Sequence, residues 1–101
     1  MTKANQNYRI KTPIKNITAD SRKVAQGSLF LAYPGEKIDG RNFIADAIKN
    51  GASAVLWDLD DFSWPVEWTV ENIGIKNLRL QAGILPRNFI KNHHQNYGLL
   101  A

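Results

Sequence analysis

Glycines at both ends of residues 35–40 resemble the frame of a phosphate-binding loop. Such a loop requires Lys after the second glycine and then Ser or Thr for magnesium, but Arg41 and Asn42 stand there. The carboxylates of Glu36 and Asp39 would also repel phosphate where backbone amides should bind it. We therefore interpret the stretch as a glycine turn leading into a capped helix, and we exclude a nucleoside-triphosphate site.

Ser21 carries a hydroxyl that could act as a nucleophile, but no His is near it in the sequence. The two histidines of the chain, His93 and His94, lie near its C-terminal end. We therefore interpret Ser21 as a turn residue or a hydroxyl that contacts a ligand. Its neighbours Asp20 and Arg22 could pair with each other, or Arg22 could face a phosphate. We favour the local pair.

Metal binding and nucleic-acid binding are both disfavoured. Adjacent histidines point in different directions on a helix, and no carboxylate lies at ligand spacing from this pair. Trp57, Trp64 and Trp68 could stack bases, but only Trp64 falls in a predicted loop. The basic residues are spread along the chain, and a net charge of +4 is the only feature that favours a polyanion partner.

Two predicted strands position the candidate loops. Residues 17–19 are β-prone and end in the turn 20–22. Residues 29–33 form a continuous apolar run, which is typical of a strand covered on both faces, and Pro34 ends it. Ligands bind at the carboxyl ends of strands in open α/β sheets, so the best candidate loops are 20–22 and 35–39.

A helix is predicted to begin near Asp39, a good N-cap residue, and to end at Gly51, a good C-cap residue. Apolar residues at three- and four-residue spacings between them share one face. Residues 54–57 read as the next strand. Strand, helix and strand at this spacing predict a right-handed crossover and a parallel pair.

The remaining elements are predicted from alternation and periodicity. Residues 66–70 alternate apolar and polar and predict a half-buried strand, which residues 71–74 close. A second helix is predicted from about Asn77, with a break or kink near Leu85 because Pro86 removes a backbone donor.

Length and composition bound the possibilities. The 101 residues suffice for one domain, and 44% hydrophobic residues support a packed core. The absence of cysteine excludes disulfides and thiolate metal sites. No run approaches the ~20 apolar residues of a membrane span, and the polar N-terminus does not resemble a signal peptide. We expect a cytoplasmic protein without a membrane partner.

Several short motifs, taken together, resemble the N-terminal domain of the Mur ligases. The resemblance is dense over residues 14–57 and looser over residues 66–85. The motifs are Asp20-Ser21-Arg22, Gly27-Ser28-Leu29-Phe30-Leu31-Ala32, Pro34-Gly35, Asp39-Gly40-Arg41, Phe43-Ile44, Ala47-Ile48 and Gly51-Ala52-Ser53-Ala54-Val55-Leu56. Any one of them is weak, whereas the set is specific.

The resemblance implies a small three-layer α/β domain with a mostly parallel sheet. It divides the chain into an N-terminal extension (1–13), a UDP-binding domain (14–85) and a divergent tail (86–101). The central ATP-binding and C-terminal domains of full ligases have no counterpart in this sequence. The chain is then a part of a ligase, a truncated product or a divergent stand-alone domain.

Within the family the chain most resembles MurE, which adds the third amino acid to UDP-N-acetylmuramoyl-L-alanyl-D-glutamate. The D-alanyl-D-alanine-adding MurF remains an alternative, as does a non-enzymatic interaction module derived from such a domain. The resemblance implies that the uridine diphosphate end of the substrate contacts Ala19, Ser21, Glu36, Lys37 and Ile38. ATP and magnesium are implied only for a full-length ligase, and we expect the isolated domain to be inactive.

Overall fold

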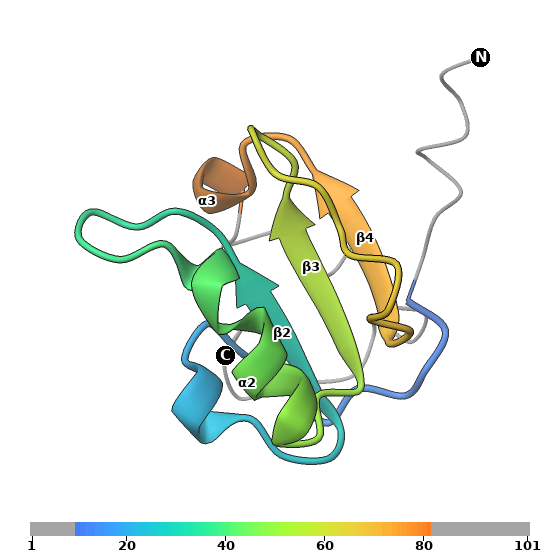
Figure 1. The fold of residues 1–101 in the computed structure, drawn as a ribbon. Coiled ribbons are helices and arrows are strands. Elements are labelled where there is room, and N and C mark those ends of the chain that lie inside the picture. Colours follow the sequence, from blue (N-terminus) through green and yellow to red (C-terminus); the bar gives the residue numbers. More distant parts are fainter. Residues whose placement is uncertain (1–9, 82–101) are drawn as a thin grey trace.

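The computed structural model describes residues 10–81, and residues 1–9 and 82–101 lie outside this range (Figure 1). The strands are β1 (Asn16–Thr18), β2 (Ser28–Ala32), β3 (Ala54–Asp58) and β4 (Glu71–Ile75). The α-helices are α2 (Ile44–Lys49) and α3 (Leu78–Gln81), and the two short 3-10 helices are η1 (Ser21–Lys23) and η2 (Gly40–Phe43). None of the helices in the described range is long and apolar enough to cross a membrane.

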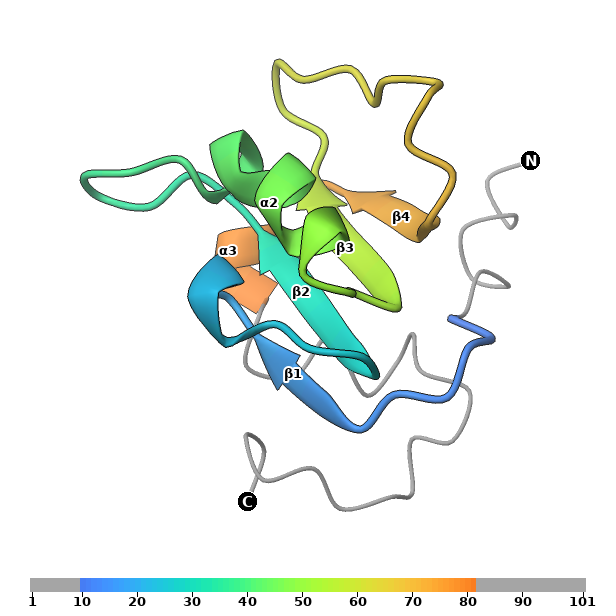
Figure 2. The same cartoon turned by 60° about the horizontal axis from the view of Figure 1, so that its bottom comes forward.

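The four strands form one sheet in the order β1-β2-β3-β4, and every neighbouring pair is parallel. Residues from all three connections pack on the same face of the sheet: Val24 between β1 and β2, Ile44 in α2, and Trp64 between β3 and β4. Figure 2 shows α2 lying over this face. Right-handed crossovers between parallel strands that advance in one direction produce this arrangement.

Apolar side chains cover both faces of the sheet and make the three-layer architecture that the sequence predicts. In β2, Phe30 and Ala32 face the α2 side, whereas Leu29 and Leu31 face the opposite cluster. Successive strand residues point to opposite faces, so a strand covered on both sides is apolar throughout. All five residues of β2 are accordingly buried.

The opposite face is covered by the segment that precedes β1 and by α3. Ile10 and Ile14 from the first, and Leu78 from the second, join the same apolar cluster. Ile10 lies within the predicted N-terminal extension and is nevertheless fully buried. The Glu71 carboxylate at the start of β4 holds this segment by accepting hydrogen bonds from the backbone N–H groups of Lys11 and Thr12.

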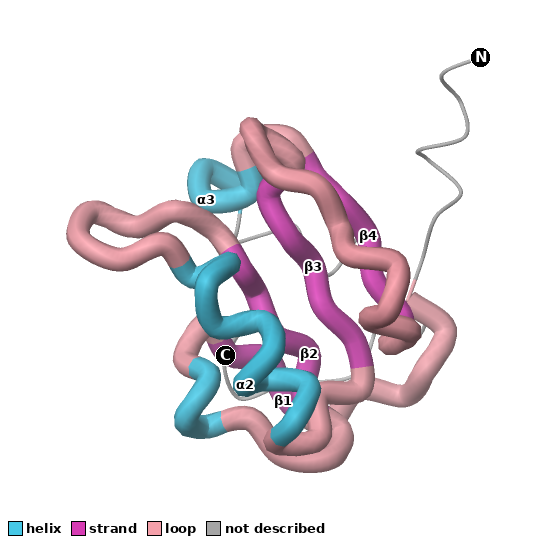
Figure 3. The backbone as a smooth tube through the Cα atoms, viewed as in Figure 1, coloured by secondary structure: helices cyan, strands magenta, loops and turns pink. Residues whose placement is uncertain are grey.

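The prediction of a strand over residues 66–70 is wrong. These residues form turns and loop, Val66 is 91% exposed, and β4 occupies residues 71–75 instead (Figure 3). The reason is aromatic packing: the ring of Trp64 stacks on Trp57 at 5.4 Å and meets the ring of Trp68 edge-on at 5.2 Å. The segment therefore lies on the sheet face, and Trp64 packs in the fold rather than forming an open stacking platform.

The helix after β2 begins in two steps. Asp39 is the N-cap, as predicted, but it caps the 3-10 helix η2, and α2 starts only at Ile44. Gly51 follows α2 with a φ of +105°, which confirms the predicted left-handed C-cap. The second predicted helix begins at Leu78; the expected break near Leu85, the tail 86–101 and the pair His93-His94 lie outside the described residues.

Candidate functional site

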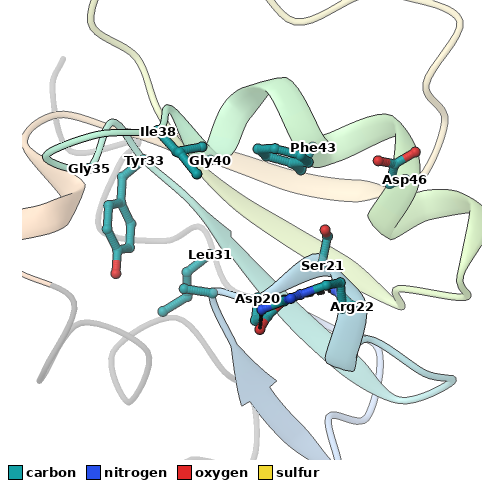
Figure 4. A pocket seen from close by; sticks show the side chains of 11 residues that line it. Asp20, Ser21, Arg22, Leu31, Tyr33, Gly35, Ile38, Gly40, Phe43 and Asp46 are labelled. Atoms are coloured by element: carbon teal, nitrogen blue, oxygen red, sulfur yellow. Dashed lines mark hydrogen bonds and ion pairs between the residues drawn. The ribbon is translucent and has the colours of Figure 1, made fainter.

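A cavity of about 590 Å³ lies at the carboxyl ends of β1 and β2 (Figure 4). Its walls come from η1, from α2 and from the loop of residues 33–40, which we call the β2–α2 arm. The lining combines apolar and aromatic side chains, among them Leu31, Tyr33 and Phe43, with the polar Ser21 and Asp46. Figure 4 shows the Ser21 hydroxyl directed toward α2 across this space. Both loops that the sequence predicts as ligand-binding therefore border one cavity.

The η1 side of the cavity is built by a local charge pair. The Asp20 carboxylate caps η1 by accepting from the Arg22 backbone N–H at 2.9 Å. It also accepts from Nε and Nη2 of the Arg22 guanidinium at 3.0 and 2.9 Å, so the predicted local pair is present. These side-chain hydrogen bonds lower the pKa of Asp20 to about 2. The Asn50 amide donates to the Ser21 carbonyl at 3.0 Å and ties η1 to the end of α2.

The β2–α2 arm is a narrow hairpin-like loop. The Gly35 N–H donates to the Ile38 carbonyl and the Gly40 N–H to the Tyr33 carbonyl, each at 2.8 Å. A β-carbon on Gly40 would lie 3.1 Å from the Tyr33 oxygen, so only glycine fits there without displacing the opposite chain. The arm projects beyond the carboxyl end of β2 (Figure 1).

Arg41 fixes the base of the arm. Its guanidinium lies against the Asp39 carboxylate, with Nη2 2.8 Å from Oδ2 and Nε 3.0 Å from Oδ1. Its Nη1 donates to the backbone carbonyls of Asp58, the last residue of β3, and of Asp60 in the loop that follows. The hydrogen bond from Arg41 lowers the pKa of Asp39 against the opposing effect of burial. The Arg41 guanidinium and the Asp39 carboxylate form an ion pair with each other. This agrees with our rejection of a phosphate-binding loop here.

The cavity brings together three of the five predicted site residues. Ala19, Ser21 and Ile38 line it. Glu36 and Lys37 are exposed on the arm and do not line it, and Glu36 lies 3.5 Å from the Arg79 guanidinium. The arm as a whole borders the cavity, whereas the side chains of these two residues do not form its wall.

Sequence reasoning missed the aromatic lining and Arg41. It assigned Phe43 to the apolar face of a helix and Tyr33 to the end of a strand. It treated Arg41 as a mismatch to a phosphate-binding loop and as part of a family motif, without a contact or a role. The position of the two aromatic residues could have revealed their role, because both flank the turn at the carboxyl end of β2, where ligands bind in open α/β sheets. The contacts of Arg41 with residues 58 and 60 leave no local pattern in the sequence.

The lining of the cavity suits the binding of a small molecule. Its apolar and aromatic walls, together with a few hydrogen-bonding groups, are typical of small-molecule pockets. Within residues 10–81, no group of three or more His, Cys, Asp or Glu side chains could hold a metal ion.

Comparison with known proteins decides the family. The family model described as "Mur ligase family, catalytic domain" matches residues 13–89 of this chain. The chain belongs to the Mur ligase family. It corresponds to the N-terminal domain of these ligases, as the motifs between residues 14 and 57 indicated.

Curated relatives of this Mur ligase domain are MurE enzymes. It is 53% identical over 79 residues to the UDP-N-acetylmuramoyl-L-alanyl-D-glutamate–2,6-diaminopimelate ligase of Chromobacterium violaceum, covering 77% of this chain and 16% of that enzyme. The same enzyme of Neisseria meningitidis serogroup A is 53% identical over 68 residues, with coverages of 66% and 14%. The chain thus spans about one sixth of the length of the Chromobacterium relative.

Solved structures of MurF enzymes share the fold. The Acinetobacter baumannii ligase superposes with a TM-score of 0.59 and 31% identity, covering 74% of this chain and 16% of its own. The Thermotoga maritima MurF ligase, solved with ADP, gives a TM-score of 0.56 at 23% identity, covering 72% and 16%. The MurF alternative is not better supported than MurE, because the curated MurE relatives reach the higher identity.

Proposed function

We propose that this domain binds the uridine diphosphate end of UDP-N-acetylmuramoyl-L-alanyl-D-glutamate, as the N-terminal domain of a MurE-type ligase. The supporting observation is the cavity at the carboxyl ends of β1 and β2, bordered by the segment from Ala19 to Arg22 and by the β2–α2 arm. It occurs in a chain that is 53% identical, over 79 residues, to a ligase named for that substrate. Open α/β sheets bind ligands at this edge.

The lining suggests how the nucleotide is held. The rings of Tyr33 and Phe43 and the side chain of Ile38 supply apolar surface for a flat pyrimidine ring. The Ser21 hydroxyl and the backbone at Ala19 supply hydrogen-bonding groups for the ring or the diphosphate. Glu36 and Lys37 contribute backbone groups and the shape of the arm.

The chemistry of the reaction lies outside this domain in our proposal. ATP and magnesium serve a full-length ligase through its other domains, and the isolated domain binds the substrate without turning it over. The partner of the domain is then the rest of such a ligase, working in the cytoplasm. The alternative of a stand-alone interaction module depended on the tail 86–101, which lies outside the described residues.

The direct test is a titration of the isotopically labelled 101-residue chain with UDP-N-acetylmuramoyl-L-alanyl-D-glutamate, followed by amide NMR. We expect shifts clustered at residues 19–22 and 35–39. Ser21→Ala should weaken binding several-fold through the loss of one hydrogen bond. The matched control is Ser63→Ala, because Ser63 is exposed in the β3–β4 loop and does not line the cavity.

Two outcomes would contradict the proposal. Shifts that cluster away from these two segments would place the ligand elsewhere. An absence of shifts at millimolar ligand, together with self-association of the chain, would favour the interaction module.

A further inference from the structure

Arg41 is the one buried cation of the described range, residues 10–81, and it lies next to the cavity without being part of its lining. Its side chain is 9% exposed, and its guanidinium lies 5.2 Å from the ring centroid of Phe62. Burying a charge is costly unless it is paired and hydrogen-bonded, so a guanidinium in this position needs all the contacts around it.

Those contacts join two segments that the sheet alone does not connect. Asp39 belongs to the β2–α2 arm, whereas the carbonyls of Asp58 and Asp60 belong to the end of β3 and the loop that follows. The planar guanidinium reaches both at once, because its donors form a rigid fork. One side chain therefore sets where the arm leaves the sheet relative to the neighbouring strand.

The arm depends on this anchor for its orientation. Its internal hydrogen bonds, from Gly35 to Ile38 and from Gly40 to Tyr33, shape the hairpin but do not attach it to β3. At its outer part the Glu36–Arg79 contact is 3.5 Å long and involves two exposed side chains, which makes it a weak tie. Among the hydrogen bonds of the described residues, those of Arg41 with Asp39 on one side and with the Asp58 and Asp60 carbonyls on the other are therefore the principal link between the arm and β3.

We propose that Arg41 is a positioning residue for the nucleotide site: it ties the base of the β2–α2 arm to the end of β3 and so holds the arm wall of the cavity in its binding shape. This inference rests on the function proposed above. Arg41 does not contact the ligand. It acts through Tyr33, Gly35, Ile38 and Gly40, the residues by which the arm lines the cavity.

Three variants separate the contributions. Arg41→Gln removes the charge and the fork. Arg41→Lys keeps the charge but offers a single ammonium that cannot span both segments. Asp39→Asn retains an oxygen that can accept the Arg41 backbone N–H and cap η2, while it removes the ion pair. Lys49→Gln, in the last turn of α2, is the control for the loss of one positive charge.

The first readout needs no ligand. In Arg41→Gln we expect amide shifts to change in residues 33–40 and 58–62, while amides in the centres of β2 and β3 stay in place. Tryptophan emission should change as well, because Phe62 lies over Arg41 and 5.6 Å from Trp57. Lys49→Gln should leave both signals unchanged.

The second readout is affinity for UDP-N-acetylmuramoyl-L-alanyl-D-glutamate, measured at a temperature where each variant is folded. If the arm holds its binding shape only one tenth of the time, the apparent dissociation constant rises about tenfold. We expect this loss for Arg41→Gln, a smaller loss for Asp39→Asn, and no rescue by Arg41→Lys.

The outcomes separate the two proposals. A wild-type chain that binds, with a folded Arg41→Gln that binds equally well, would overturn the role of Arg41 and leave the proposed function intact. A wild-type chain without affinity would overturn both. A melting temperature that falls while affinity and arm shifts stay unchanged would make Arg41 a stabilising residue only.

Discussion

Replacing Glu71 by Gln tests how the segment before β1 is held on the sheet. The Glu71 carboxylate accepts from the Lys11 N–H at 2.6 Å, the Thr12 N–H at 3.0 Å and the Thr12 hydroxyl at 2.7 Å. The held segment carries Ile10 and Ile14 into the apolar core. Gln keeps one acceptor oxygen and replaces the other by an amide group that cannot accept from Lys11.

The size of the effect follows from these contacts. A hydrogen bond to a charged group contributes about 1.5–3 kcal/mol. Glu71 is half-buried and the Lys11 donor is exposed, so water replaces part of what is lost. We expect Glu71→Gln to lower the free energy of unfolding by about 1–2 kcal/mol at neutral pH.

The effect should depend on pH. Burial raises the pKa of Glu71, but the hydrogen bonds donated by Lys11 and Thr12 outweigh it and lower the pKa below its ordinary value. A carboxylate with a lowered pKa stabilises the fold above its unfolded pKa of about 4.3, and this contribution is lost as the pH falls through the folded pKa. The difference between wild type and Glu71→Gln should therefore shrink in acid.

The assay is urea unfolding followed by tryptophan fluorescence, at pH 7 and at about pH 3. Glu67→Gln is the control, because Glu67 is exposed in a turn and its loss should change stability little at either pH. The carboxylates of Asp20 and Asp39 titrate in both proteins and cancel in the difference. A Glu71→Gln effect that is absent at pH 7, or equally large at both pH values, would refute the reasoning.

Three further substitutions test the fold and the site locally. Ile44→Val, at a fully buried position in α2, should lower the free energy of unfolding by about 0.5–1.5 kcal/mol in urea titrations. Gly51→Ala should lower the free energy of unfolding by more than about 1 kcal/mol in the same assay, because φ is +105° there and the added carbon would lie 3.3 Å from the backbone nitrogen of Gln26. The carboxyl carbon of Asp20 should titrate by NMR with a pKa of about 2, and Arg22→Gln should raise this value because the main hydrogen-bond donor is removed.

Local patterns predicted the part of the domain between β1 and β3. The apolar run ending near Tyr33, the Asp39 N-cap, the helix face and the Gly51 cap all depend on neighbours within a few residues, and all are present. The prediction failed over residues 66–70, where alternation indicated a strand. There the packing of Trp64 on Trp57 decided the conformation, and that contact cannot be read from a short window.

The sequence likewise predicted one part of the candidate site, whereas the other part depends on the tertiary structure. Residues 20–22 and 35–39 were predicted as ligand-binding loops because parallel strands place their carboxyl ends at one edge. Their meeting at one cavity depends on β1 pairing with β2, and the exclusion of the Glu36 and Lys37 side chains from the lining depends on how the arm folds. Whether these residues contact a nucleotide stays a prediction.

The amino-acid sequence by itself determined the parallel strand–helix–strand unit, its caps and the family, since these rest on periodicity and on short motifs. Only the tertiary structure decided where β4 runs, how the cavity closes and what Arg41 does. Arg41 bonds to carbonyls 17 and 19 residues away, at Asp58 and Asp60. Backbone carbonyls are identical in every residue, so a side chain that binds them leaves no trace in the sequence of its partners.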